Sequence, residues 1–163
     1  MGTLYYKYDV EYDFNYELEV VGGLDLPGKF YCQDITSKKD KFTGEVTFSS
    51  PIKDGITLIK VVNKGIVSLY MSALEIGNTA NVGKTGVYLS LENGIKISKP
   101  NVKISIDANT NNYRYSCFFP LTPNDIKLLK KYKITDKRLY IYDGSVNDDS
   151  ANYIRGYINC LSK

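Results

Sequence analysis

Residues 4–20 read LYYKYDVEYDFNYELEV, and an apolar or aromatic side chain occupies every even position of this stretch. Most of the odd positions between them are charged or polar. A period of two places successive side chains on opposite faces of an extended chain, so the stretch predicts a β-ribbon with one apolar and one acidic face. At about 3.3 Å per residue the ribbon reaches roughly 55 Å. A compact domain of this chain length is roughly 40 Å across. We therefore expect the ribbon to bend, to break into a hairpin, or to extend onto a neighbouring molecule.

The charge of the chain is distributed unevenly. Residues 1–20 carry one lysine against five acidic residues, a net charge of −4, and because the whole chain has a net charge of +3, the rest of it carries +7. An acidic strand beside a basic body favours docking of one on the other, within a chain or between chains. The alternative is that the acidic face is simply solvated.

The composition excludes several classes of enzyme. The 163 residues include no histidine and no tryptophan, which removes the commonest general base and the commonest transition-metal ligand. Gly83-Lys84-Thr85 has neither the glycine spacing nor the following helix of a phosphate-binding loop. The acidic segment 143–149 does not match the EF-hand pattern. We therefore predict no catalytic residue, no cofactor and no metal ligand.

The cysteines and the N-terminus suggest where the protein folds. Cys32, Cys117 and Cys160 are an odd number at wide, unpatterned spacing, which is typical of reduced core residues. No apolar run approaches the length of a membrane helix, and the first residues lack the features of a signal peptide. We expect synthesis in the cytoplasm, with the virion as a later location, and no membrane partner.

Short alternating segments separated by turn residues follow the ribbon. Residues 86–92 alternate, Asn93-Gly94 follows, and residues 95–97 alternate again. Two alternating runs joined by Asn-Gly predict a β-hairpin with a type I′ turn. Similar runs recur along the chain, and the whole of residues 1–163 is predicted to form one mostly β domain, an antiparallel sandwich or barrel.

Two helices are predicted near the C-terminus. Thr122 is a good N-cap, Pro123 suits the first helical position, and Asp125 lies in the first turn, so we expect a helix over about 122–133. Apolar residues at helical spacing predict a second helix over about 150–161, although Gly156 weakens it.

Tyrosine is unusually common, with 15 residues, and its amphipathic ring suits interfaces. The alternative is that tyrosine fills half-buried sheet faces in a chain that has no tryptophan. The interface candidates combine the ribbon's aromatic residues with lysines of the first predicted helix: Tyr6, Tyr8, Tyr12, Phe14, Tyr16, Lys127, Lys130 and Lys131. Basic residues near aromatic ones could form a stacking groove for a nucleotide or single-stranded nucleic acid: Tyr113, Arg114, Tyr115, Arg138 and Tyr140.

The segments 86–94, 115–129 and 137–142 together resemble small uncharacterised β-rich proteins of Bacteroidota and their phages. The shared features are a strand ending in an acidic-Gly turn, a helix capped by Pro-Leu-Thr, and a strand that begins with arginine. The resemblance covers residues 86–142 and rests on caps, turns and core positions. It implies a phage or bacterial accessory protein and carries over no catalytic residue.

These observations lead to one expected function and one alternative. We expect a non-enzymatic assembly or binding protein, a phage virion or accessory component, that oligomerises with itself or with other virion proteins through strand pairing. The alternative is a protein that binds a small ligand such as a nucleotide signal in a pocket lined by tyrosine and lysine.

Overall fold

The structure is a computed structural model that describes residues 28–163 of the chain. The ribbon predicted over residues 4–20 lies outside the described residues, as do the interface candidates that it contains. Nothing in the structure therefore tests those predictions.

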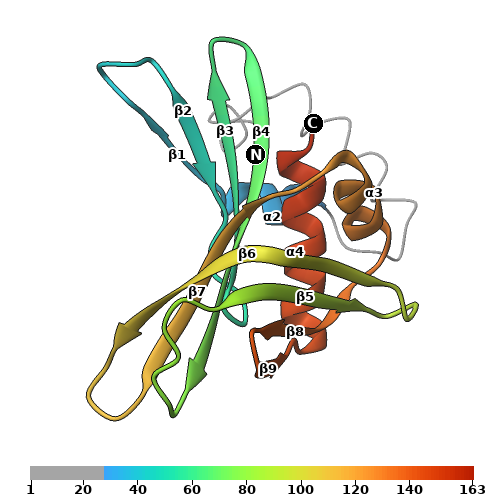
Figure 1. The fold of residues 1–163 in the computed structure, drawn as a ribbon. Helices are drawn as coiled ribbons and strands as arrows, with labels where there is room; N and C mark the ends of the chain where they lie inside the picture. The colour runs from blue at the N-terminus through green and yellow to red at the C-terminus, as the bar shows by residue number, and fades with distance from the viewer. Residues whose placement is uncertain (1–27) are drawn as a thin grey trace.

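Within the described residues, nine strands form one antiparallel sheet in the order β1-β2-β3-β4-β7-β6-β5-β8-β9. The prediction of a mostly antiparallel β fold is confirmed. Of the two architectures that the sequence left open, the closed barrel is not formed, because the sheet is strongly curved but its end strands do not pair (Figure 1). The strands are β1 (Thr36–Lys39), β2 (Val46–Ser49), β3 (Ile56–Asn63), β4 (Ile66–Gly77), β5 (Thr85–Leu91), β6 (Lys96–Ala108), β7 (Tyr113–Pro120), β8 (Ile134–Leu139) and β9 (Tyr142–Ser145).

Both predicted helices are present. Helix α3 spans Pro123–Lys131, and a capping box at its start joins the Thr122 side chain to the Asp125 backbone and the Asp125 side chain to the Thr122 backbone. Helix α4 spans Asp148–Leu161, with Asn147 as its N-cap. A further short helix, α2 (Gly28–Gln33), was not predicted.

The core lies between α4 and one face of the curved sheet (Figure 1). Alternate residues of the central strands are buried there, such as Leu69, Met71 and Ala73 of β4. Apolar residues of α4 fill the space opposite them. Gly156 has a packing role, because a Cβ at this position would lie 2.2 Å from the Tyr31 ring of α2. The glycine that weakens the sequence signal for α4 is therefore what allows α2 to pack closely against it.

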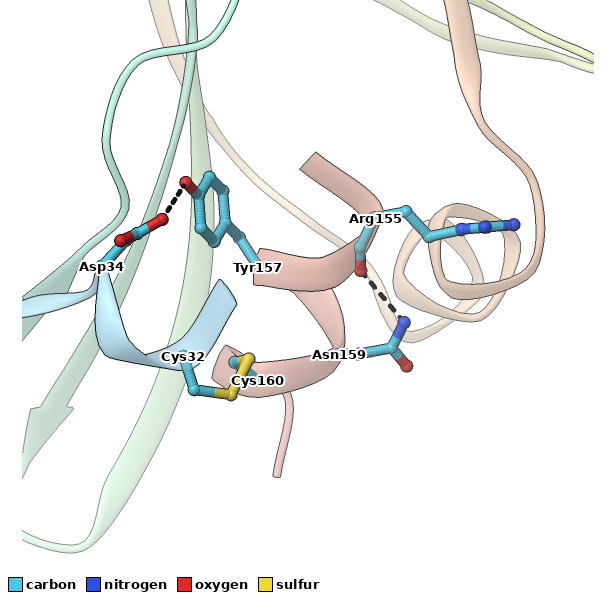
Figure 2. Close-up of a disulfide and its surroundings, with 6 residues drawn as sticks. All are labelled: Cys32, Asp34, Arg155, Tyr157, Asn159 and Cys160. Atoms are coloured by element: carbon cyan, nitrogen blue, oxygen red, sulfur yellow. Dashed lines mark hydrogen bonds between the residues drawn. A yellow bond between two sulfur atoms is a disulfide. The ribbon is translucent and has the colours of Figure 1, made fainter. Parts of the chain in front are cut away.

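A disulfide joins Cys32 of α2 to Cys160 of α4, beside a hydrogen bond from the Tyr157 hydroxyl to Asp34 (Figure 2). The prediction of reduced cysteines is therefore wrong for Cys32 and Cys160, while Cys117 is a free, buried thiol. The error arose because α2 was not predicted. This helix places Cys32 beside Cys160, which lies in the last turn of α4 and is 128 residues away in sequence. Since disulfides persist mainly in oxidising compartments, the cytoplasmic prediction loses the support that it took from the cysteines.

The hairpin between β5 and β6 is confirmed, but its turn differs from the predicted type I′ turn. The Leu91 N–H donates to Ile95, so the loop is Glu92–Gly94, and only Gly94 has a positive φ, of 83°. Gly94 supplies the left-handed conformation that a longer hairpin loop requires at one position. In the described part of the chain, no helix has the length and apolar character needed to cross a membrane.

Candidate functional site

The β1–β2 hairpin and the turn end of the β3–β4 hairpin project beyond α4 (Figure 1). We call this projection, residues 36–49 and 60–69, the arm. Its two turns expose large apolar side chains: Phe42 is 99% exposed and Ile66 is 70% exposed. Solitary exposed apolar residues are common on protein surfaces, but here they occur on neighbouring hairpins of one projection. The arm is therefore a candidate interaction surface.

The arm continues the two faces of the sheet. The strand register pairs Val46 with Val62 and Val62 with Val67, and directly opposed residues share a face. These valines lie on the same face as Phe48 and as the buried Leu69, which is the face that α4 covers further along the sheet. The inner face of the arm is thus largely apolar and only partly buried, and it also carries Lys39 and Lys60, whose ammonium donates to the Lys163 carbonyl.

Strand β1 forms the outer edge of the arm, and all four of its residues are exposed. It carries Lys38 and Lys39, and Lys41 follows in the turn. The nearby Asp40 is engaged by the turn itself, because its carboxylate accepts the N–H groups of Phe42 and Thr43 at 2.8 Å. These hydrogen bonds hold the pKa of Asp40 below its ordinary value. The edge is therefore basic.

The backbone of β1 offers hydrogen-bonding groups on its open side. The Asp40 N–H donates to Glu45 on the partner strand at 2.8 Å. Because residues of an antiparallel strand alternate between facing the partner and facing away, Lys38 and Thr36 also face β2, whereas Ser37 and Lys39 direct their N–H and C=O groups outward. No strand among residues 28–163 lies on that side.

At the opposite end of the sheet, one face of β9 packs against side chains of β4 and of the loop that follows it. A buried Lys137 of β8 forms an ion pair with Glu75 of β4, and Gly144 of β9 is so close that a Cβ there would collide with the Glu75 carboxylate. The Tyr142 hydroxyl lies 2.5 Å from the Thr79 hydroxyl and 3.0 Å from the Asn81 amide. These contacts hold the curled end of the sheet against β4.

These side chains form an inner polar cluster, which consists of Glu75, Thr79, Asn81, Tyr115, Lys137 and Tyr142. Burial raises the pKa of the Tyr115 hydroxyl, which donates to the Thr79 carbonyl. The hydrogen bond with Thr79 lowers the pKa of Tyr142. Burial also raises the pKa of the neighbouring Cys117 thiol to about 11, so this thiol is protonated and inert at neutral pH. Because Lys137 and Tyr115 are buried and hydrogen-bonded, the cluster acts as a brace between strands.

The predicted stacking groove is not assembled. Arg114 is exposed and pairs with Asp107 on the outer face of the sheet, whereas Tyr115 points inward and is fully buried. Tyr113 lies on the same inner face as Tyr115, as the strand register shows. The remaining two candidates lie elsewhere: Arg138 donates to Asp143 on β9, and Tyr140 packs under Lys84, whose ammonium is 5.3 Å from the ring centroid.

The predicted lysines of the interface, Lys127, Lys130 and Lys131, are exposed on α3. Helix α3 adjoins the arm only at its β4 side, where Pro123 and Ile126 line one hollow with Val67 and Leu69, and it lies far from β1 in Figure 1. The structure therefore does not bring these lysines together with Lys38 and Lys39 of β1. Among residues 28–163, no group of three or more Cys, Asp or Glu side chains is placed to hold a metal ion.

The basic edge was missed by the sequence reasoning. Residues 36–39 read TSKK, which contains no apolar residue and hence no alternation to mark a strand. The signal available was the following Asp-Lys-Phe-Thr-Gly segment, whose Asp and Gly are typical turn residues. Read together with the apolar Val46 and Phe48 beyond it, that turn predicts a hairpin whose first strand is polar.

No protein-family model, no curated protein and no solved structure matches this chain. Its function is therefore inferred from its own residues.

Proposed function

We propose that the protein is a non-enzymatic assembly protein that forms a homo-oligomer through strand pairing of residues 4–20. The open, exposed edge of β1 is the observation that carries this proposal. An edge strand presents unpaired N–H and C=O groups and readily accepts a further strand. The sequence supplies a candidate donor, since residues 4–20 alternate strictly and, if fully extended, would be longer than one compact domain.

Charge supports the same assignment. Five of the eight odd positions of residues 4–20 are acidic, whereas β1 and the turn after it contribute three lysines, Lys38, Lys39 and Lys41. Opposite charges across a contact speed encounter and fix its register. The location of the assembly, in a phage virion or as an accessory component, follows from the resemblance of residues 86–142 and is part of the proposal.

The test is the native mass of the full chain and of a variant that lacks residues 1–20, measured by light scattering on a sizing column. We expect the full chain to have a multiple of 18.4 kDa and the truncated chain to be a folded monomer. Circular dichroism and a cooperative thermal transition establish that the truncated chain is folded. A full chain that is monomeric at all concentrations, or a truncated chain that keeps the native oligomer, would overturn the proposal.

A length-preserving variant serves as a matched control for the deletion. Tyr12→Asp with Phe14→Asp places charge on the apolar face of residues 4–20, while Asp13→Asn with Asn15→Asp changes only the acidic face and leaves its net charge unchanged. The first pair should dissociate the oligomer and the second should leave its mass unchanged. Raising the salt concentration should weaken the oligomer, because the charges concerned are exposed.

A shallow hollow of about 270 Å³ on the outer face of the sheet supports the alternative, a small-ligand site. Tyr88, Lys96 and Arg138 line it together with Asp136 and Asp143. The hollow is slightly smaller than most ligand pockets, and Arg138 is already paired with Asp143 at 2.7 Å. A thermal-shift screen with mononucleotides and cyclic nucleotides tests this function. Stabilisation that rises with nucleotide concentration would support it, and no shift at millimolar concentration would exclude it.

A further inference from the structure

We infer that β1 of a second copy of this chain is the acceptor for residues 4–20, which add to it as an extra strand of the sheet. The inference rests on the proposed function and goes beyond it by naming the acceptor strand, its orientation and its partner. It starts from the two ends of the sheet, which are the places where a strand could be added.

The end at β9 is a poor acceptor. Gly144 of β9 packs against the Glu75 carboxylate, and Tyr142 is held by Thr79 and Asn81. A strand added beyond β9 would have to fit beside β4 and the loop that holds Tyr142. In addition, β9 carries no lysine or arginine, and Arg138 of β8 is already paired with Asp143, so this edge strand offers no positive charge of its own to the acidic positions of residues 4–20.

The end at β1 has neither obstacle. Ser37 and Lys39 direct their backbone groups outward, and all residues of β1 are exposed. The strand spans about 13 Å at 3.3 Å per residue, so it engages only about a quarter of a ribbon that reaches roughly 55 Å. The rest of the ribbon is free to span the gap between the two copies.

The two faces of the arm select which way residues 4–20 add. Val46, Phe48, Val62 and Val67 lie on the inner face of the arm together with Ser37, Lys39 and Lys60. The apolar even positions belong on that side because four large apolar side chains already lie there. The acidic odd positions then lie on the outer side, beside Lys38, whose partner across β2 is Thr47. Slipping the pairing by one residue would turn the acidic side chains at the paired positions toward the inner face, beside Lys39 and the valines, and the aromatic side chains toward solvent, so burial of the aromatic residues favours the first parity.

Each chain has one donor segment, residues 4–20, and one acceptor edge, β1. Two symmetric arrangements pair every donor with an acceptor. Reciprocal exchange produces a closed dimer, whereas donation in one direction produces a growing chain of copies. A mass that saturates at twice the monomer indicates the first arrangement, and a mass that increases with concentration indicates the second. Both arrangements use β1.

The decisive experiment compares two matched proline variants of the full chain. Ser37→Pro removes an outward N–H from β1 but leaves both lysines and the β1–β2 hydrogen bonds in place, and proline is tolerated on an edge strand. Ser145→Pro makes the equivalent change on the open side of β9, because the Val146 N–H bonds to Thr135 and the alternate residue faces outward. We expect Ser37→Pro to raise the dissociation constant at least tenfold and Ser145→Pro to leave it unchanged.

If Ser37→Pro does not fold, a charge variant tests the same inference, because it changes only side chains and keeps every backbone N–H. Lys38→Glu with Lys41→Glu should weaken the oligomer, and adding Glu11→Lys with Asp13→Lys on residues 4–20 should restore it. Loss of the oligomer with Ser145→Pro, or no response to both β1 variants while deletion of residues 1–20 still dissociates it, would overturn the inference and leave the proposed function standing. An oligomer that survives the deletion would overturn the proposed function itself.

Discussion

The two edges of one sheet are built in opposite ways. At β9 the sheet curls back, and the inner polar cluster holds it against β4 through the buried Lys137–Glu75 ion pair. At β1 the sheet projects past its helices, and the edge is exposed, polar and basic. Proteins often protect edge strands from pairing with other molecules by covering them or by placing lysine on them. Here one end strand packs against β4 and the other carries exposed lysines, whose charge is complementary to that of an acidic strand.

The largest effect is expected from breaking the Cys32–Cys160 disulfide, which anchors α2 next to the start of β1. In the chain-entropy model a closed loop of this length, 128 residues, stabilises the fold by about 5 kcal/mol, and measured values are usually smaller. Cys32→Ser with Cys160→Ser should therefore lower the free energy of unfolding by about 2–5 kcal/mol in urea denaturation. Hydrogen exchange should increase first in α2 and β1 and least in β8 and β9.

Reductant provides the matched comparison for that variant. It should destabilise the native protein by the same amount and leave the double serine variant unchanged. Equal stability of oxidised and reduced protein would show that α2 is held by packing alone, through Tyr31 and Gly156.

A smaller loss is expected from removing one member of the buried ion pair at the other edge. Glu75→Gln leaves the Lys137 ammonium buried without its counter-charge. Breaking a fully buried ion pair in this way costs about 3–5 kcal/mol. The loss of stability should be smaller here, because the Glu75 side chain is 16% exposed. Lys38→Gln on the open edge should change the free energy of unfolding by less than about 0.5 kcal/mol. Urea denaturation of the two variants compares their free energies of unfolding, and so shows how much each end of the sheet contributes to stability. If they were equally stable, the inner polar cluster would not be a brace.

Two glycine substitutions should have smaller effects than Glu75→Gln and still separate the two regions. At Gly144 an added Cβ would lie 1.7 Å from the Glu75 carboxylate oxygen, so Gly144→Ala must displace the ion pair at a cost of about 1–3 kcal/mol. At Gly65, in the turn of the arm, the Cβ would meet open space and only the φ of +80° is unfavourable, which costs about 1 kcal/mol. Thermal denaturation should rank the two variants in that order, and the reverse order would contradict the close approach of β9 to β4.

Local patterns were sufficient to predict the regular parts of the fold. The alternation of residues 86–92 predicted β5, and the cap of Thr122, Pro123 and Asp125 predicted α3, because in each case the determining residues are neighbours in sequence. The sequence reasoning failed where the determining contact is distant. Helix α2 has only six residues and no acidic first turn, and it is stabilised by Cys160 and Tyr157 far along the chain.

The candidate site was less predictable than the fold for the same reason. Tyr113, Arg114 and Tyr115 are adjacent in sequence, but strand alternation divides them between two faces of the sheet. Lys137 and Glu75 are 62 residues apart, and only the curvature of the sheet brings them together. The basic edge is a special case. The residues of β1 have no strand-like pattern of their own, and they form a strand because they pair with β2.

The disulfide has a mechanical consequence for an assembled chain. Tension on residues 4–20 would enter the body at α2, and the covalent bond at Cys32 would transmit it directly into α4, the helix that packs against the core. The backbone between α2 and β1 would then carry little of the load. In the reduced protein the same tension would pass through Ile35 into β1 and pull it from β2 one hydrogen bond at a time. In the proposed assembly, the disulfide would thus keep β1 of the same copy paired with β2.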